Sequence, residues 1–464
     1  MSRILFFDDR YLHVVSHAKR RMGQAELLRD TLYGDPCPDI FANIPNIIYS
    51  QPLGCWIMLT YGMHLKEFYD VILLHKSKDG LHWEPFDTTE LLPLETRKYP
   101  NQLFELGQCG EYTVYQDDLA PEEERFKLLA IRHQSGVKQN PLESCLFTSS
   151  DGLHWTDQNI SWHPSPPDLG PLSIYYNAER GAYVIATRPA MVDRRVALME
   201  TVEWRHFSKP QVVLETDALD TPICESYGIT VLPYDNYYLG LYWLFHPNAE
   251  QVTAFPGGVS GKYFDGYVDA QMTASENGWY FKRGLRDPVL PNGTPGAPDC
   301  GCIYPRWIRR DSDGSILIHA CIYPYEHGRW REFVHEPHPH HSIAVYRIRE
   351  DGFCYYENIG GEAFLGTRAL RYTGGPVYFN TQCPTGSLRV QVTDACGNLI
   401  PGYSFADCLP FSGDDVHHEP IWKENRHLQD LTGQTIRFEL RLKTGRIYAI
   451  QGNLVLILQP DINK

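Results

Sequence analysis

Acidic residues stand at several points of the sequence directly ahead of apolar runs that have the pattern of β-strands. The four that we single out are Asp39, Asp168, Glu225 and Asp299. If the runs converge on one pocket, two of these carboxyl groups could act as a pair. Hydrolysis of a glycosidic bond needs an acid that protonates the leaving oxygen and a carboxylate that attacks or activates water. The structural alternative is that each Asp beside Pro or Gly only caps a turn.

The neighbours of these residues suggest their roles. Glu225 lies in Ile223–Tyr227, where apolar and aromatic side chains favour burial. Burial raises the pKa of a carboxyl group towards the range in which it can donate a proton, so Glu225 is the predicted general acid. Asp39 is the predicted base or nucleophile, Asp299 could support either role, and Asp168 is the reserve. Alternatively, Glu225 is a buried carboxylate bonded to backbone at a seam between sheets.

Three arginines next to strand-like runs are candidates for substrate binding. They are Arg132, Arg188 and Arg306. A guanidinium group could hold sugar hydroxyl groups or a sugar carboxylate. The same residues could instead form salt bridges between sheets.

A histidine-rich run at residues 335–341 is the densest group of titratable side chains in the sequence. Within it, His338, His340 and His341 are candidates for hydrogen bonds to a substrate. Imidazole-rich loops can also bind a transition metal, but two prolines and the lack of a second cluster argue against a preformed cage. We therefore predict no cofactor, with a structural or site metal near this run as the alternative.

A repeated hairpin forms the framework that must position these residues. Ser77–Trp83 returns almost unchanged as Ser149–Trp155. The Asp-Gly pair in each copy supplies the positive φ angle of a tight turn, and the Leu-His-Trp that follows begins the next strand. Weaker copies follow around Trp204, Trp279 and Phe353.

Strand-like runs precede these turns in matching order, such as 55–61 and 71–75 before the first copy and 126–131 and 145–148 before the second. Five copies of about four strands each predict a five-bladed β-propeller. In this fold the innermost strand of each blade begins at the central funnel. Side chains just before those strands therefore converge on one pocket.

The pattern changes after Gly360-Gly361 to shorter alternating strands such as Thr435–Leu440. Strict alternation indicates one buried face and one solvated face, as in a sandwich. The predicted fold class is thus all-β. A propeller occupies residues 1–361, with the segment of about 1–38 packing on it, and a β-sandwich occupies residues 362–464.

This architecture resembles a known family. A five-bladed propeller followed by a β-sandwich resembles glycoside hydrolase family 32, and the propeller alone is similar to families 43, 68 and 130. Leu5–Arg10 and Gly386–Ser404 also look like bacterial proteins described only as relatives of the family 32 N-terminal domain. The likeness covers nearly the whole chain, but its motifs specify architecture rather than chemistry.

The catalytic motifs of family 32 do not transfer to this sequence. That family carries Trp-x-Asn-Asp-Pro-Asn-Gly in blade one, Arg-Asp-Pro in blade two and Glu-Cys in blade three. Here Arg286–Pro288 spells Arg-Asp-Pro but follows the fourth turn, and Cys224-Glu225 is reversed and one blade late. The candidate site is therefore predicted from position along the blades.

Composition limits the classes of partner. Hydrophobic residues make up 43% and charged residues 21%, which is typical of a globular protein, and no long uncharged apolar run could span a bilayer. A net charge of −15 repels phosphate backbones and anionic lipid, so nucleic acid and membranes are poor candidates. Asp8 and Asp9 interrupt the start of the chain before any signal-length apolar stretch, and the twelve cysteines are mostly scattered singly. These features predict a cytoplasmic protein with free thiols.

The resemblance implies an exo-acting glycoside hydrolase whose partner is a small oligosaccharide, with furanosides such as fructosyl or arabinosyl units among the expected substrates. A phosphorylase similar to family 130 is one alternative. It would need a cationic phosphate pocket, and phosphate-dependent turnover would distinguish it. The missing motifs favour another alternative, a carbohydrate-binding or scaffold propeller without catalysis. The sequence does not indicate an oligomeric state.

Overall fold

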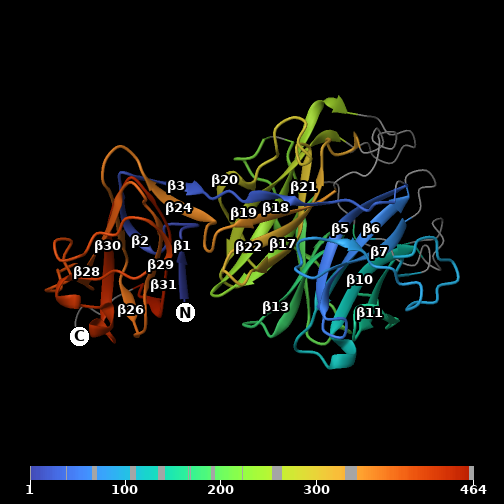
Figure 1. Cartoon of the computed structure of the whole chain (residues 1–464), viewed down its shortest axis with the longest axis horizontal. Helices are drawn as coiled ribbons and strands as arrows, with labels where there is room; N and C mark the ends of the chain where they lie inside the picture. Colours follow the sequence, from blue (N-terminus) through green and yellow to red (C-terminus); the bar gives the residue numbers. More distant parts are fainter. Residues whose placement is uncertain are drawn as a thin grey trace.

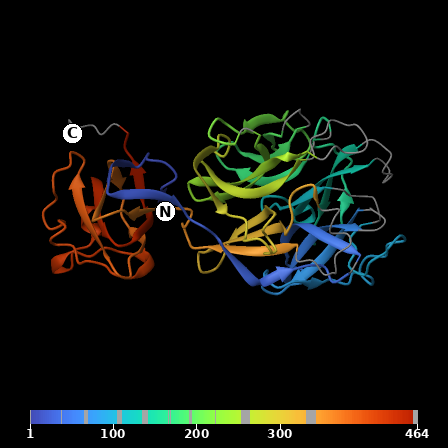
Figure 2. The ribbon, with the colours of Figure 1, turned by 90° about the horizontal axis from the view of Figure 1, so that it is seen from above.

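The structure is a computed structural model with two bodies built almost entirely from β-strands (Figures 1 and 2). It describes residues 2–37, 39–64, 70–104, 111–133, 142–165, 167, 169–189, 194–221, 223–252, 264–329 and 342–458. The helices that lie wholly within these ranges are short 3-10 turns: η1 (Glu122–Glu124), η4 (Lys423–Asn425) and η5 (Leu428–Leu431). No helix in these ranges has the length and apolar character needed to cross a membrane.

The larger body contains three four-stranded antiparallel sheets and one eight-stranded sheet, in which two antiparallel groups of four strands are joined by a single parallel bridge between Val268 and Cys302. These five groups of four strands correspond to the blades of the predicted propeller. Blade one contains β5 (Ile40–Ser50), β6 (Cys55–His64), β7 (Asp70–Ser77) and β8 (Glu84–Pro85). Blade two contains β9 (Tyr112–Gln116), β10 (Phe126–His133), β11 (Leu142–Ser149) and β12 (Thr156–Asp157). Blade three contains β13 (Leu169–Asn177), β14 (Ala182–Arg188), β15 (Val196–Thr201) and β16 (Gln211–Leu214). Blade four contains β17 (Glu225–Tyr234), β18 (Tyr237–Val252), β19 (Phe264–Ser275) and β20 (Lys282–Leu290). Blade five contains β21 (Cys302–Arg310), β22 (Ile316–Tyr323), β23 (Ile343–Ile348) and β4 (Glu26–Tyr33).

The innermost strands close into a ring. Each of β5, β9, β13, β17 and β21 contacts the next, and β21 contacts β5. The fifth blade takes its outermost strand, β4, from the start of the chain, because β4 pairs with β23 in antiparallel register. The two ends of the propeller sequence are thereby joined within one blade.

The repeated turn between the third and fourth strands is capped in the same way in several blades. In blade one, Asp79 Oδ1 accepts the backbone N–H groups of Leu81 and His82 at 2.8 and 2.9 Å. The glycine that follows has a φ of 75°, as predicted for a tight turn. Equivalent capping residues in the next three blades are Asp151, Glu203 and Asn277.

Two packed sheets form the smaller body, the predicted β-sandwich. One contains β1 (Ser2–Leu5), β3 (Ala18–Met22), β24 (Cys354–Asn358), β27 (Tyr378–Gln382), β29 (Asp414–His418) and β31 (Arg446–Gly452). The other contains β2 (Leu12–Ser16), β25 (Ala363–Thr367), β26 (Leu370–Tyr372), β28 (Ser387–Asp394), β30 (Thr435–Lys443) and β32 (Leu454–Leu456).

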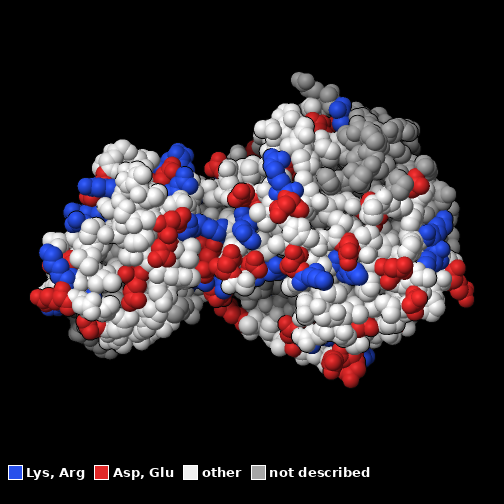
Figure 3. Space-filling view, in the orientation of Figure 1, with Lys and Arg blue, Asp and Glu red and all other residues white. Residues whose placement is uncertain are grey.

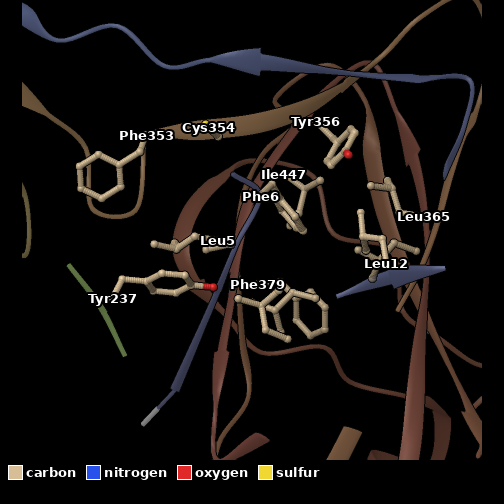
Figure 4. Close-up of a cluster of buried hydrophobic side chains, with 14 of the residues drawn as sticks. Leu5, Phe6, Leu12, Tyr237, Phe353, Cys354, Tyr356, Leu365, Phe379 and Ile447 are labelled. Atoms are coloured by element: carbon tan, nitrogen blue, oxygen red, sulfur yellow. The ribbon is translucent and has the colours of Figure 1, made fainter. Parts of the chain in front are cut away.

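The domain limits differ from those expected. The segment 1–38 was predicted to pack on the propeller, but its first three strands belong to the sandwich and only β4 joins a blade. Apolar side chains explain this placement, because Leu5, Phe6 and Leu12 are buried among strands from the C-terminal part (Figure 4). The chain crosses to the sandwich before β24, several residues ahead of the predicted start at 362.

The cysteines of the described residues are free, and the surface carries charges of both signs (Figure 3). The eleven cysteines within the described ranges form no disulfide bonds. Acidic and basic side chains are interspersed over the face drawn in Figure 3. Such a mixed surface lacks the continuous basic tract that would attract nucleic acid on that face.

Candidate functional site

A cavity of about 310 Å³ lies where the innermost strands converge. Each blade supplies a residue to its wall, either directly before its innermost strand or among the first four residues of that strand. These residues are Asn43, Glu111, Leu169, Tyr227 and Tyr304, in blade order. The cavity is therefore the funnel of the propeller, formed by segments that are far apart in the sequence.

Register shifts interrupt four of the five innermost strands close to these residues. The shifts lie between Asn43 and Asn46, Leu169 and Ser173, Ser226 and Gly228, and Pro305 and Trp307. An extra residue at such a bulge bends the strand and redirects the side chains beside it. The shape of the funnel thus depends on local irregularities of the blades.

Aromatic rings form much of the funnel wall. Tyr323 and Tyr325 are stacked with ring centroids 5.2 Å apart and planes 3° apart, and the rings of Tyr227 and Tyr304 lie 5.1 Å apart. Trp243 also lines the cavity. Such rings present apolar faces together with polar edges, a combination that suits a ligand with both apolar and hydroxyl surfaces.

The tyrosine hydroxyl groups are suited to donate hydrogen bonds. Burial raises the pKa of Tyr227, although the charges of Arg188 and Arg194 act in the opposite direction. The Tyr227 Oη lies 3.1 Å from His327 Nε2, which also belongs to the cavity wall. Tyr227 therefore stays protonated at neutral pH.

Two carboxylates, Glu111 and Glu326, line the cavity. Glu111 Oε2 accepts the N–H of Gly170 at 3.3 Å, which links the start of blade two to blade three. Glu326 follows β22, and its buried Oε2 accepts no hydrogen bond from the described residues. A buried carboxylate oxygen with no protein donor is a site where a ligand hydroxyl group can bind.

Arg306 and Asn43 add two more polar groups with unused capacity among the described residues. Arg306 donates from Nη2 to the Tyr112 carbonyl at 3.1 Å, whereas its Nε has no acceptor there. Burial lowers the pKa of Arg306, and the charge of Glu111 opposes that effect. Asn43 donates to Tyr323 Oη at 3.3 Å, and its buried Oδ1 accepts nothing from the described residues. The funnel therefore offers donors and acceptors to a polar ligand.

Among the predicted substrate-binding arginines, Arg306 lines the cavity and the other two do not. Arg188 lies behind the wall, where it donates to the Tyr227 carbonyl at 3.1 Å and stands 4.6 Å from the centroid of that ring. Arg132 pairs with Glu143 at 2.7 Å and with Asp157 at 2.8 Å inside blade two. Arg132 thus forms salt bridges within one sheet, rather than between sheets as the alternative expected.

The predicted catalytic carboxylates in the described ranges are not part of the cavity wall. Glu225 is buried beside the funnel and forms an ion pair with Arg194. Asp299 accepts the hydroxyl of Tyr346 at 2.8 Å. Asp39 stands directly before β5, as expected, but outside the lining. Asp168, His338, His340 and His341 lie outside the described residues.

The sequence reasoning missed both funnel carboxylates. It singled out no carboxylate at the start of blade two, where β9 begins at Tyr112. The position of Glu111 directly before Tyr-Thr-Val-Tyr was the available signal. Glu326 gave no comparable signal, because it follows the second strand of its blade rather than preceding the first.

Comparison with known proteins adds similarity of fold. No family model matches the chain, and no curated protein matches it. Among solved structures, the β-1,2-mannobiose phosphorylase from Listeria innocua in complex with β-1,2-mannobiose is 12% identical, with 73% of this chain and 98% of that chain covered and a TM-score of 0.47. The GH43_1 enzyme from Xanthomonas citri complexed with xylotriose is 9% identical, with 69% and 91% covered and a TM-score of 0.39.

One similar structure extends over most of the chain. It is the N-acetylgalactosamine deacetylase from F. plautii in complex with blood group B trisaccharide, which is 12% identical with a TM-score of 0.41. The match covers 92% of this chain and 96% of that one. At these identities and TM-scores the likeness says nothing of the chemistry of this chain.

Proposed function

We propose that this protein is a glycoside hydrolase that binds the terminal unit of a small oligosaccharide in the funnel. The observation that carries the proposal is the placement of Glu111 and Glu326 on one aromatic-walled cavity where the five blades meet. A volume of about 310 Å³ is at the small end for ligand pockets. That size favours exo action on a terminal sugar, including the fructosyl or arabinosyl units expected from the resemblance.

In the proposed reaction, Glu111 is the base or nucleophile and Glu326 is the general acid. The N–H of Gly170 and the positive charge of Arg306 stabilise the ionised form of Glu111. Glu326, whose Oε2 accepts no hydrogen bond from the described residues, is the remaining carboxyl group that could protonate the leaving oxygen. Asp39, Asp168, Glu225 and Asp299 form the second set of candidates.

Arg306 supports one alternative reaction. Its guanidinium lines the cavity with Nε unused among the described residues, so inorganic phosphate could bind there and attack in place of water. The enzyme would then be a phosphorylase.

The test measures sugar release from a panel of oligosaccharides and aryl glycosides, with and without inorganic phosphate. We expect Glu111→Gln and Glu326→Gln to reduce turnover of a natural oligosaccharide by about 10²–10⁴-fold. Glu326→Gln should largely spare aryl glycosides with good leaving groups, because those substrates need little protonation. Glu111→Gln should impair both classes.

Glu225→Gln is the matched control, because Glu225 lies beside the funnel but outside its lining. Large losses in Glu225→Gln and Asp39→Asn, with full activity in the Glu111 and Glu326 variants, would support the second set instead. Release that depends on phosphate would identify a phosphorylase. Binding of oligosaccharides without any turnover would instead support the alternative of a propeller without catalysis.

A further inference from the structure

Blade four carries a thiol, an imidazole and a carboxylate in one chain of contacts outside the funnel lining. Cys224 Sγ lies 3.2 Å from His246 Nδ1, and His246 Nε2 lies 3.0 Å from Asp269 Oδ2. Cys224 directly precedes β17, and the other two residues lie on β18 and β19. These three strands are neighbours, with Glu225 paired to Phe245 and Leu244 paired to Asp269.

The imidazole ring is held in a fixed orientation. It stacks on Tyr267 with centroids 4.3 Å apart and planes 13° apart. Asp269 is only 6% exposed, so its carboxylate accepts the Nε2 proton in a setting with little water. Nδ1 is thereby directed at the thiol. A nucleophile, a base and a third group that orients the base are the parts of an activated thiol.

The proton affinity of His246 also supports an activated thiol at Cys224. Burial lowers the pKa of His246, but the hydrogen bonds with Asp269 and Cys224 outweigh it and raise the value to about 9. The imidazole therefore carries a proton at neutral pH and can donate it from Nδ1 to a thiolate. An imidazolium beside a cysteine stabilises the thiolate, which is the reactive form.

Other groups around the sulfur fit a thiolate as well. Thr221 Oγ1 lies 2.6 Å from Sγ, so its hydroxyl can donate a second hydrogen bond. The ionisable groups facing the pair from β18 and β19 are Tyr242 and Tyr267, and burial raises the pKa of both. Their hydroxyls are therefore neutral at pH 7. The adjacent Glu225 is paired with Arg194.

A second acidic group nearby is also neutralised. Asp220 pairs with Arg283 at 2.6 Å, and this guanidinium lies over the Tyr242 ring. Among the described residues around Cys224, Asp269 is thus the carboxylate that acts through His246.

We propose that Cys224 is a thiolate site that reacts with small electrophiles, with hydroperoxides as the class it takes. Cys224 is 6% exposed and the His246 side chain 15%, so only a small molecule can reach the sulfur. The site is separate from the proposed glycosidase chemistry and does not depend on it.

The reaction is a two-electron transfer from sulfur to peroxide. The thiolate attacks the terminal oxygen of the hydroperoxide, an S–O bond forms and the O–O bond breaks. Sulfur is oxidised to a sulfenic acid, and the peroxide is reduced. The departing alkoxide or hydroxide takes the proton from His246 Nδ1 and leaves as an alcohol or water.

The first experiment measures iodoacetamide alkylation of each cysteine in the native full chain by mass spectrometry across the pH range. Cys396 is exposed and serves as the internal reference. An ordinary thiol, with a pKa of about 8.5, reacts about tenfold more slowly for each pH unit below that value. If Cys224 is a thiolate over this range, its rate stays nearly constant, and its ratio to Cys396 rises roughly 50-fold from about pH 8.5 to about pH 6.5.

Variants distinguish a cysteine that reacts because it is ionised from one that reacts only because it is accessible. His246→Gln should make the Cys224 rate fall in parallel with that of Cys396, and Asp269→Asn should give a smaller change of the same kind. Cys396→Ser is the matched control and should leave the Cys224 profile unchanged. If His246→Gln does not fold, Asp269→Asn and Thr221→Val carry the comparison.

The second experiment treats the protein with hydrogen peroxide and traps sulfenic acid with dimedone. Cys224 should be labelled in the native chain, and at least about tenfold more slowly in His246→Gln, in line with the loss of a positioned proton donor. Parallel pH profiles for Cys224 and Cys396 would overturn the proposal. So would an absence of dimedone labelling at Cys224.

Discussion

The two ends of the propeller blades follow different rules. At one end, the turn after the third strand is repeated, and an Asp, Glu or Asn caps it in blades one to four. At the other end, the funnel takes a different residue type from nearly every blade: Asn43, Glu111, Leu169, Tyr227 and Tyr304. The chain repeats itself where each blade needs the same turn and varies where the blades must jointly shape one cavity.

The fifth blade breaks the rule at the turn end. Asp351 has a φ of 56° and stands where Gly80 stands in blade one. It accepts hydrogen bonds from Tyr234 Oη at 2.7 Å and Gln451 Nε2 at 2.6 Å. It also forms an ion pair with Arg3. Gln451 and Arg3 belong to sandwich strands, so this copy of the turn joins the two bodies.

The largest effect on stability should come from Asp351→Ala. This change leaves the Arg3 guanidinium, 9% exposed, without one of its carboxylates and removes the acceptor of a buried tyrosine. Breaking a buried pair on one side costs about 3–5 kcal/mol of the free energy of unfolding. Urea unfolding measures it, with glycoside turnover at low temperature as the second readout.

The control for that variant is Asp79→Ala, since Asp79 is an acidic residue of the corresponding turn of blade one, where it is exposed. Loss of a local cap should cost only about 1 kcal/mol, by analogy with helix caps. Equal losses in the two variants would show that the fifth turn has no special role.

The next largest effect is a loss of stability at low pH, which two buried histidines cause. The ring of His75 lies 2.8 Å from both Tyr33 Oη and Thr60 Oγ1, and His319 Nε2 donates to the Gly80 carbonyl at 2.8 Å. Burial lowers the pKa of each to about 4. An unfolded histidine binds its proton near pH 6.5, so the unfolded chain holds more protons between about pH 4 and 6.5.

Stability should therefore fall as the pH drops from about 6.5 to about 4, by on the order of 3 kcal/mol for each histidine. The check is the difference between the pH profiles of the native chain and of His319→Gln, because carboxylates titrate equally in both. His246 acts with the opposite sign: its raised pKa adds stability below about pH 6.5, which is lost as the pH rises through about 9. Parallel profiles for native chain and variant would contradict the role of His319.

The fold could be predicted from the sequence because its repeats are local. Asp-Gly turns and runs of apolar residues lie within one hairpin, so the sequence around Gly80 and Gly152 was sufficient. The placement of the first strands could not be predicted in this way. β1 pairs with β31, almost the whole chain away, and no local pattern specifies so distant a partner.

Prediction of the site was limited for a different reason. Sequence reasoning expected side chains just before the innermost strands to meet. Glu111 lies there, whereas Asn43, Tyr227 and Tyr304 lie inside the strands. Arg306 does line the funnel. The sequence could not tell which side chains point inwards, since the register shift between Ser226 and Gly228 alters the direction of neighbouring side chains. Glu225 thus meets Arg194, while Tyr227 reaches the cavity.

The smallest expected effect comes from comparing two turn glycines, one of which packs against a neighbouring blade while the other does not. Gly152 has a φ of 82° and Gly181 a φ of 61°, so alanine at either position adopts an unfavourable left-handed conformation. A Cβ atom at Gly152 would lie 2.5 Å from Cδ1 of the buried Ile48, whereas one at Gly181 meets open space. Gly152→Ala should therefore lower the free energy of unfolding by about 1–2 kcal/mol more than Gly181→Ala, in the range of overpacked cores. Glycoside turnover should be the same in both variants, because both glycines lie far along their blades from the funnel lining. An equal loss of stability in the two would mean that the repeated turn is set by its own geometry and that Ile48 moves aside freely.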